Sequence, residues 1–310
     1  MRRGVSEMKG ELVKFKNSEG LFLDGMYFAC EDSKKVIIHI HGSFGNFYSN
    51  YFIKEMADVY VTAGFNFLTF NLTQHDGIAE AVRETSKGSS WEYVGYAISS
   101  YDSCIDDIKG AIDFVKKCGN ERIILQGHSL GCNRVIHFCN CVHNSYEVVL
   151  LSPTDSMQIQ EKWIFPEKIE TQILRLQKKA NKKEILFGEH GVYTKDMEID
   201  KSVDNIPYIP VSANSLISLL RNPSFNFVNT LEQSGKVQNQ AFIYYGNKDE
   251  YQTWPVEKYE HIFINHFKDA YFFIVEEGNH SFQGYERKVC NEIIAWLKNE
   301  RKGRDNNENA

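Results

Sequence analysis

The feature that most constrains the fold of this chain is a Gly-x-Ser-x-Gly pentapeptide at residues 127–131. It directly follows an apolar run at residues 122–126, and it precedes a stretch at 132–143 whose apolar residues recur at helical spacing. A serine placed between a buried strand and a helix is typical of a nucleophile elbow, a sharp turn in which glycines avoid clashes. The turn lifts the hydroxyl of Ser129 clear of the sheet and leaves the N–H of Leu130 available to stabilise an oxyanion. The pattern therefore predicts a strand–turn–helix unit with Ser129 as nucleophile.

Apolar runs alternate with amphipathic stretches along much of the chain. The expected strands are residues 11–16, 21–28, 36–40, 65–70, 122–126, 147–151, 241–245 and 271–275. The expected helices lie near residues 50–63, 101–117 and 132–143, from 255 onward, and over 282–299. Strands that alternate with helices imply right-handed crossovers and a mainly parallel sheet. We therefore expect an α/β fold with helices on both faces of the sheet and an antiparallel pair, the first two strands, at one edge.

The alternation stops between Ser152 and about Lys236. This polar stretch contains two helix candidates, one beginning at Phe165 and one after Ser212, and no clear strand. We expect a core domain of residues 1–152 and 237–300, with residues 153–236 inserted as a helical lid over the C-terminal edge of the sheet. A decoration away from the site is the alternative. The charged, Asn-rich tail of residues 301–310 is expected to be disordered.

Composition narrows the class of partner. The formal net charge of −6 argues against nucleic acid or an anionic membrane surface as the main partner. The seven cysteines show no metal-type spacing, which favours free thiols in a reducing compartment. No apolar run is long enough to span a membrane, and the first residues lack the apolar region of a secretory signal. We expect a cytoplasmic protein without a metal or cofactor, acting on a small molecule, with homo-oligomerisation left open.

A serine nucleophile needs a base, and His280 is the candidate. It follows the last predicted strand and precedes the final helix, so it lies at the sheet edge where the elbow presents Ser129. His39, His261 and His266 fall inside a predicted strand or helix and are expected to be structural or exposed.

The base in turn needs an acid to orient it, and Asp249 is our choice. It leaves the strand before that of His280, so the chain order is serine, acid, histidine, as this architecture requires. Glu250 is the close competitor, and Asp155 is a further alternative from an earlier strand.

The oxyanion needs a second backbone donor beside Leu130. Residues 41–45, with the sequence His-Gly-Ser-Phe-Gly, stand after the first parallel strand, where that donor is expected. Their glycines let the backbone approach a substrate closely. We assign the donor to the Ser43 N–H, with the Phe44 N–H as the alternative.

Together these motifs resemble the α/β-hydrolase superfamily of serine hydrolases, in the order residues 41–45, Ser129, Asp249 and His280. The segments 127–132 and 150–155 are more narrowly similar to a group of intracellular esterases that includes siderophore esterases. The superfamily resemblance implies a Ser-Asp-His triad without metal or organic cofactor. It leaves the substrate open, because one scaffold hosts many activities.

The function expected from these features is hydrolysis of a carboxylic ester through an acyl-enzyme. Acyl transfer to another acceptor or thioester cleavage in a biosynthetic pathway is the first alternative, and a ligand-binding protein that keeps the fold without turnover is the second. Arg134, near the start of the elbow helix, is expected on the helix surface, where it meets solvent or attracts an anionic group.

Overall fold

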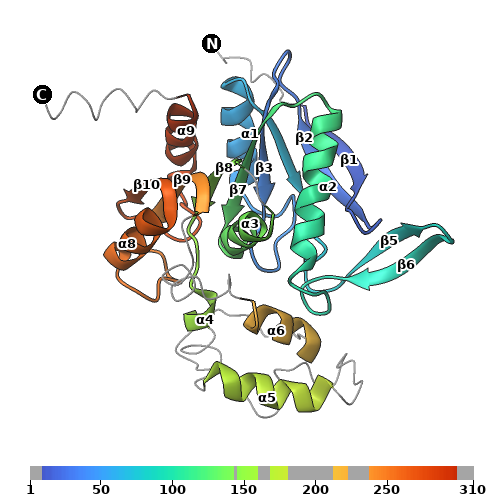
Figure 1. Cartoon of the computed structure of the whole chain (residues 1–310). Coiled ribbons are helices and arrows are strands. Elements are labelled where there is room, and N and C mark those ends of the chain that lie inside the picture. The colour runs from blue at the N-terminus through green and yellow to red at the C-terminus, as the bar shows by residue number, and fades with distance from the viewer. Residues whose placement is uncertain (1–8, 143–144, 160–167, 181–211, 223–236, 299–310) are drawn as a thin grey trace, which may run out of the picture.

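The computed structural model describes residues 9–142, 145–159, 168–180, 212–222 and 237–298. Within these residues the chain forms a large sheet with helices on both faces, and a separate hairpin (Figure 1). The strands are β1 (Glu11–Lys16), β2 (Phe22–Phe28), β3 (Lys35–Ile40), β4 (Asn66–Phe70), β5 (Ala79–Thr85), β6 (Gly88–Val94), β7 (Arg122–His128), β8 (Glu147–Leu151), β9 (Val237–Gly246) and β10 (Phe267–Val275). The helices are α1 (Phe52–Thr62), α2 (Ser103–Lys117), α3 (Leu130–Cys141), α4 (Ser156–Ile159), α5 (Ile169–Ala180), α6 (Ala213–Leu220), α8 (Val256–His266) and α9 (Glu286–Leu297).

The main sheet has eight strands in the order β1-β2-β4-β3-β7-β8-β9-β10. The pairs β1–β2 and β2–β4 are antiparallel, and all pairs from β4 to β10 are parallel. The predicted α/β fold and its antiparallel edge pair are therefore confirmed. Strands β9 and β10 extend further toward the N-terminus than the apolar runs that predicted them.

The register of the parallel strands brings their C-terminal ends to one edge. Ile40, the last residue of β3, pairs with Gly127 near the end of β7. At the far side of the sheet, Val275 and Gly246, the last residues of β10 and β9, pair with each other. Loops that leave such ends share one rim of the sheet, which is where ligand sites of open α/β sheets form.

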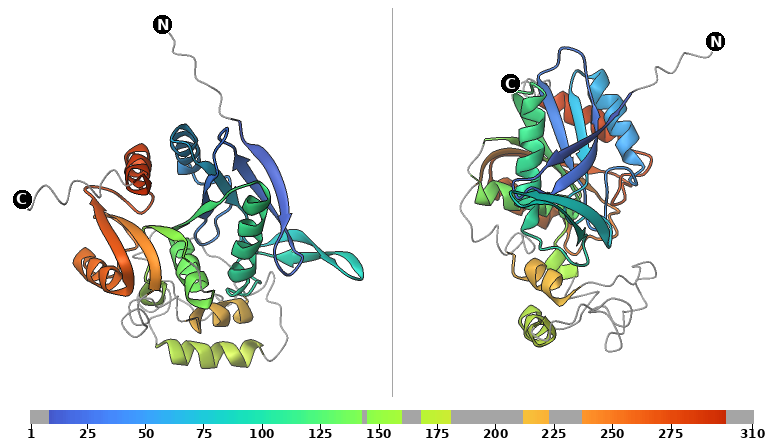
Figure 2. Two further views of the ribbon diagram at one scale, coloured as in Figure 1. Left: turned by 45° about the horizontal axis from the view of Figure 1, so that its top comes forward. Right: turned by 90° about the vertical axis from the view of Figure 1, so that its right-hand side faces the viewer.

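Alternate residues of the central strands face opposite sides of the sheet. Ile38 and Leu125 pack into the core beneath α2, α3 and α8, whereas Ile37 and Ile124 pack into the core beneath α1 and α9 (Figure 2). Because both faces are covered, the strands are continuous apolar runs without alternation. Two cores of this kind hold the strand ends, and hence the loops at the rim, in fixed positions.

The hairpin β5–β6 was not predicted from the sequence. It projects from the core near β1 and β2 (Figure 1), and its strands carry charged residues in place of a continuous apolar run. A bidentate interaction joins the two strands: Nε and Nη2 of Arg83 donate to the two carboxylate oxygens of Glu92, at 2.9 and 2.6 Å. Cross-strand charge pairs of this kind stabilise a ladder that hydrophobic periodicity does not reveal.

The final helix begins later than predicted. Phe282 and Gly284 have φ values of 54° and 84°, which lie outside the right-handed helical region. The chain therefore turns at these residues and enters α9 at Glu286.

The described part of the insertion contains α4, α5 and α6, with α5 beside α6 (Figures 1 and 2). The predicted helix start at Ser212 is confirmed, because its side chain caps α6 by accepting from the Ser215 N–H at 3.2 Å. The predicted start at Phe165 and the tail of residues 301–310 lie outside the described residues.

Candidate active site

The turn between β7 and α3 has the geometry that the pentapeptide predicts. Ser129 has φ 56° and ψ −129°, a strained conformation for a residue with a side chain. A Cβ on Gly127 would lie 2.5 Å from the carbonyl carbon of Gly131, and one on Gly131 would lie 2.1 Å from the oxygen of Ile40. Both positions therefore require glycine. The Ser129 N–H donates to the carbonyl of Leu151 at 2.9 Å, which fixes the turn against β8.

The predicted base and acid lie together in the structure. His280, between β10 and α9, has its Nδ1 at 2.9 and 3.0 Å from the two carboxylate oxygens of Asp249, which follows β9. The side chains are 8% and 2% exposed, so the pair is shielded from water. The ring of Tyr251 packs edge-on against the imidazole, with 4.7 Å between centroids. A carboxylate at Nδ1 leaves Nε2 as the nitrogen that can serve a nucleophile.

The elbow and the base meet through the residue before the nucleophile. His128 Nε2 donates to the carbonyl oxygen of His280 at 3.0 Å, and the two rings are 5.0 Å apart. Ser129 and His280 both belong to the residues that the structure describes, and no hydrogen bond joins the Ser129 hydroxyl to the His280 imidazole in this conformation. In structures without a substrate, catalytic hydrogen bonds are often long and tighten only when the substrate binds.

The other candidate acids have different partners. Glu250 is exposed, and its carboxylate accepts from the backbone N–H of His280 at 3.0 Å, so it contacts the loop and leaves the ring to Asp249. Asp155 is fully buried and accepts from Trp254 Nε1 at 2.8 Å. The geometry therefore favours Asp249 as the partner of the imidazole.

The loop after β3 lies against the nucleophile. A Cβ on Gly42 would be 2.9 Å from the Cβ of Ser129 and 3.4 Å from its Oγ, so this backbone passes directly beside the hydroxyl. Ser43 and Phe44, the two candidate donors, follow at once. Leu130 is the first residue of α3, and a first-turn N–H has no acceptor within its own helix. The segments that carry the candidate donors, the loop after β3 and the first turn of α3, thus both lie beside Ser129.

Arg134 differs from its sequence expectation. Its side chain is 0% exposed, and it lies inside the protein rather than on the surface of α3. Its Nη1 donates to the carbonyl oxygens of His41 and Gly42 at 2.8 and 3.1 Å, and its Nη2 donates to Gln74 at 3.1 Å. The expectation of a solvent-facing arginine was wrong, because α3 is covered on this side by the loop after β3. Helical periodicity alone does not report such a covering loop.

The histidines flanking the site are held neutral by burial. Burial, reinforced by the Arg134 guanidinium, lowers the pKa of His41 well below its ordinary value. Burial also lowers the pKa of His128 to about 3, with a smaller contribution from His280. Neutral imidazoles at these positions act as fixed hydrogen-bonding groups.

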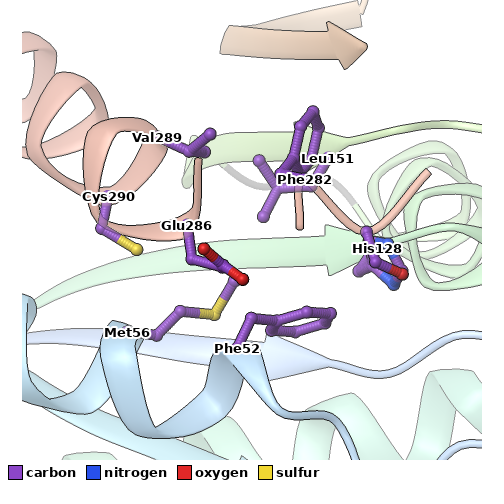
Figure 3. Close-up of a pocket in the computed structure, with 9 residues that line it drawn as sticks. Phe52, Met56, His128, Leu151, Phe282, Glu286, Val289 and Cys290 are labelled. Atoms are coloured by element: carbon purple, nitrogen blue, oxygen red, sulfur yellow. The ribbon is translucent and has the colours of Figure 1, made fainter. Parts of the chain in front are cut away.

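A small pocket lies behind the elbow, between α1 and α9 (Figure 3). Its lining is mostly apolar and includes Phe52, His128 and Phe282, with Glu286 at one side. Its space is on the order of one water molecule. It is therefore too small to receive the acyl group of a substrate.

Two absences concern the described residues alone. No cluster of histidine, cysteine, aspartate or glutamate in those ranges has an arrangement that could hold a metal ion. None of the helices described has the length and apolar character needed to cross a membrane.

Helix α6 of the insertion forms hydrogen bonds with residues 96–101, the segment that follows the β5–β6 hairpin. Ser215 donates its hydroxyl to the Tyr96 carbonyl at 2.7 Å, and Ser218 Oγ accepts from the Tyr101 N–H at 2.9 Å. The ring of Tyr96 lies 4.0 Å from that of Phe44. The insertion is thus connected through one side chain to the loop beside Ser129.

Solved structures with the same fold cover nearly the whole chain. Pyrococcus furiosus esterase Pf2001 is 15% identical, with a TM-score of 0.60 over 94% of this chain and 91% of its own. Est1E from Butyrivibrio proteoclasticus, solved with ferulic acid bound, is 15% identical, with a TM-score of 0.60 over 94% and 100%. Mouse alpha/beta hydrolase domain-containing protein 10 is 15% identical, with a TM-score of 0.59 over 94% and 99%. At such identities the likeness establishes the fold.

A comparison with curated protein sequences returned no match. A family described as "Protein of unknown function (DUF1749)" matches residues 76–298, well over half of the chain and the part that contains Ser129, Asp249 and His280. The chain therefore belongs to the DUF1749 family and has the fold of the α/β-hydrolase superfamily.

Proposed function

We propose that this protein is a serine hydrolase that cleaves a carboxylic ester through an acyl-enzyme. The observation that carries the proposal is the buried pair of His280 and Asp249, with Nδ1 and Oδ2 2.9 Å apart, at the rim where the strained Ser129 follows β7. A buried carboxylate at Nδ1 with a serine on a strained turn nearby is the arrangement that nucleophilic acyl transfer needs.

The mechanism assigns one role to each residue. His280 Nε2 takes the proton of the Ser129 hydroxyl as its oxygen attacks the ester carbonyl, and the carbonyl oxygen becomes an oxyanion. The N–H groups of Leu130 and Ser43 bind that oxyanion, and Asp249 stabilises the imidazolium. The proton then passes to the leaving alcohol as the ester bond breaks. Water attacks the acyl-enzyme with His280 again as base, which releases the acid and Ser129.

The proposal extends to the substrate and the insertion. The proposed substrate is a small-molecule ester, and the insertion of residues 153–236 is proposed as a lid over the rim. The bond from Ser215 to Tyr96 supports a lid, because Tyr96 touches the loop beside the nucleophile. We also propose a cytoplasmic location, on the grounds of the free cysteines.

The direct test is Ser129→Ala, assayed with p-nitrophenyl acetate and butyrate and with methyl ferulate. We expect kcat to fall by about 10⁴-fold or more for the ester that the parent hydrolyses, while the circular dichroism spectrum stays parental. A fluorophosphonate should label the parent and leave the variant unlabelled. Ester hydrolysis at the parental rate by Ser129→Ala, or a parent that neither hydrolyses these esters nor reacts with the probe, would contradict the proposal. Product analysis with added alcohols and amines separates hydrolysis from acyl transfer.

A further inference from the structure

A buried guanidinium lies behind the loop that approaches Ser129. Arg134 is the fifth residue after the nucleophile and is 0% exposed. No carboxylate forms an ion pair with it among the residues that the structure describes. The buried carboxylate of Asp107 attracts the guanidinium only from beyond ion-pair distance, and the ring of Tyr101 lies 6.0 Å from its Cζ. A buried charge with no carboxylate in direct contact is costly, and an apolar side chain would usually serve better for packing alone. The position of Arg134 therefore calls for another explanation.

The guanidinium acts on the backbone of one loop. Its Nη1 donates to the carbonyl oxygens of His41 and Gly42, at 2.8 and 3.1 Å. Its Nη2 donates to Gln74, whose own amide donates to the Ser99 carbonyl at 2.9 Å. The planar fork of arginine thus joins the loop after β3 to a second buried anchor.

The Gly42 carbonyl also accepts a hydrogen bond from the His41 ring, and the structure determines which ring nitrogen carries the proton. The Leu72 N–H donates to His41 Nε2 at 3.1 Å, so that nitrogen is an acceptor and the ring proton is on Nδ1. His41 Nδ1 lies 2.9 Å from the Gly42 oxygen and therefore donates to it. Three donors hold this single oxygen: the imidazole of His41, the guanidinium of Arg134 and, at 3.3 Å, the backbone N–H of Gly45. Arg134 is the one of the three that comes from outside the loop.

Holding the Gly42 oxygen also fixes the direction of the next N–H. The carbonyl of Gly42 and the N–H of Ser43 belong to the same planar peptide unit, in which the two bonds point in opposite directions. The Ser43 N–H consequently points away from Arg134. Gly42 lies close to the nucleophile, since a Cβ added to it would be 3.4 Å from Ser129 Oγ. The orientation of the peptide between Gly42 and Ser43 therefore decides whether the Ser43 N–H can reach an oxyanion formed at Ser129.

We propose that Arg134 is a positioning residue of the oxyanion hole, one that orients the Ser43 N–H and adds positive potential where the oxyanion develops. The inference rests on the proposed serine-hydrolase function and adds to it a group that never touches the substrate. Preorganised donors of this kind contribute to the rate only if their direction is fixed before the charge appears.

The test compares Arg134→Met and Arg134→Lys with the parent. Active sites are counted by the burst of a slowly deacylating p-nitrophenyl ester, so that kcat refers to folded enzyme alone. For Arg134→Met we expect kcat to fall about 10- to 100-fold with KM within about threefold, less than deletion of a donor causes. Arg134→Lys keeps the charge and loses the fork, and should fall between the parent and the methionine variant.

Inhibition by a trifluoromethyl ketone provides the readout that a packing role would not change. The Ser129 oxygen adds to its carbonyl, the hydroxyl proton moves to His280, and the ketone oxygen becomes an oxyanion. The inhibition constant should rise by the same factor as kcat falls, whereas the inhibition constant of the matching methyl ketone should stay within about twofold.

Arg122→Met is the matched control. This arginine, at the opposite end of β7, bonds to both carboxylate oxygens of Glu147 and to the Leu297 carbonyl at 2.7 to 2.8 Å. Its loss should lower the melting temperature and leave kcat per active site parental.

Parental kcat per active site in Arg134→Met would overturn the inference, as would failure of both Arg134 variants to fold, which would make the residue structural. Neither result bears on the proposed function, which falls only if the parent lacks ester hydrolysis and probe labelling.

Discussion

The two sides of Ser129 are built in different ways. On the base side, the loops after the neighbouring strands β9 and β10 hold each other. The Lys248 N–H donates to the Gly278 carbonyl at 2.9 Å, the Asn247 N–H donates to the Val275 carbonyl at 3.1 Å, and the Asn247 side chain accepts from the Glu277 N–H at 2.7 Å. On the oxyanion side, the loop after β3 is held by side chains from distant segments, among them Arg134.

This difference matters for how the site tolerates change. The geometry of the base side is set by the register of two neighbouring parallel strands, β9 and β10. Their loops can contact each other because Gly246 has no side chain: a Cβ there would lie 2.1 Å from the Gly278 oxygen. The oxyanion side depends on a buried charge that one substitution removes. We therefore expect the base side to fail only when its own acid or base is changed, and the oxyanion side to respond to residues that never meet the substrate.

The largest effect should come from the acid of the base side. Asp249→Asn keeps the shape of the side chain but lets an amide face Nδ1, which favours the wrong imidazole tautomer. We expect kcat to fall by about 10³- to 10⁴-fold. Steady-state kinetics at several pH values measure this loss.

Glu250→Gln is the matched control for that substitution. The Glu250 carboxylate accepts a hydrogen bond from the backbone N–H of His280, and an amide oxygen can accept the same bond. Its kcat should stay within about threefold of the parent, since a neutral acceptor replaces a charged one at an exposed site. If Glu250→Gln were the damaging change and Asp249→Asn harmless, the assignment of the acid would be wrong.

The same contrast explains what the sequence could predict. Ser129, Asp249 and His280 each follow an apolar run, so their arrival at one rim follows from strand order and parallel pairing, which local patterns reveal. The structure brings Asp249 and His280 together as predicted. Their catalytic roles stay predictions.

Arg134 and the β5–β6 hairpin could not be predicted in this way. Arg134 is buried because a loop about 90 residues earlier in the chain covers it, and no local period encodes such a contact. The hairpin depends on a bond between Arg83 and Glu92, not on apolar alternation. The sequence did contain one local signal for Arg134: it directly precedes the apolar residues Val135 and Ile136, on a helix with few charged residues to face solvent.

A smaller loss should follow from crowding the oxyanion side directly. Gly42→Ala places a Cβ 2.9 Å from that of Ser129, so the loop must retreat from the nucleophile. We expect kcat to fall about 10- to 100-fold, because displacement of a catalytic group by about 1 Å has effects of that size. Gly77→Ala, where an added Cβ meets nothing within 4 Å, is the control and should keep parental kinetics. Equal kcat in the two variants would remove the distinction between the sides.

The smallest expected effect is on the pH dependence of the unfolding free energy, and it comes from substitution of His128, where the elbow contacts the His280 loop. Burial lowers the pKa of this histidine to about 3, whereas in the unfolded chain it titrates near 6.5. Between these values the unfolded chain binds a proton that the folded chain does not, so stability falls as the pH is lowered through this window. His128→Gln can still donate to the His280 carbonyl and has no such proton to bind. The slope of unfolding free energy against pH, between pH 4 and pH 6, should therefore decrease by about 1.4 kcal/mol per pH unit.

Urea denaturation at a series of pH values measures this slope, and His261→Gln, at an exposed histidine of α8, is the matched control. His39 and His41, whose pKa values are also lowered by burial, remain in both variants, so some acid sensitivity persists. An unchanged slope in His128→Gln would mean that His128 accepts a proton in the folded protein. The hydrogen bond from His128 to the His280 loop would then not depend on a buried neutral imidazole, and the base side would be open to water at its junction with the elbow.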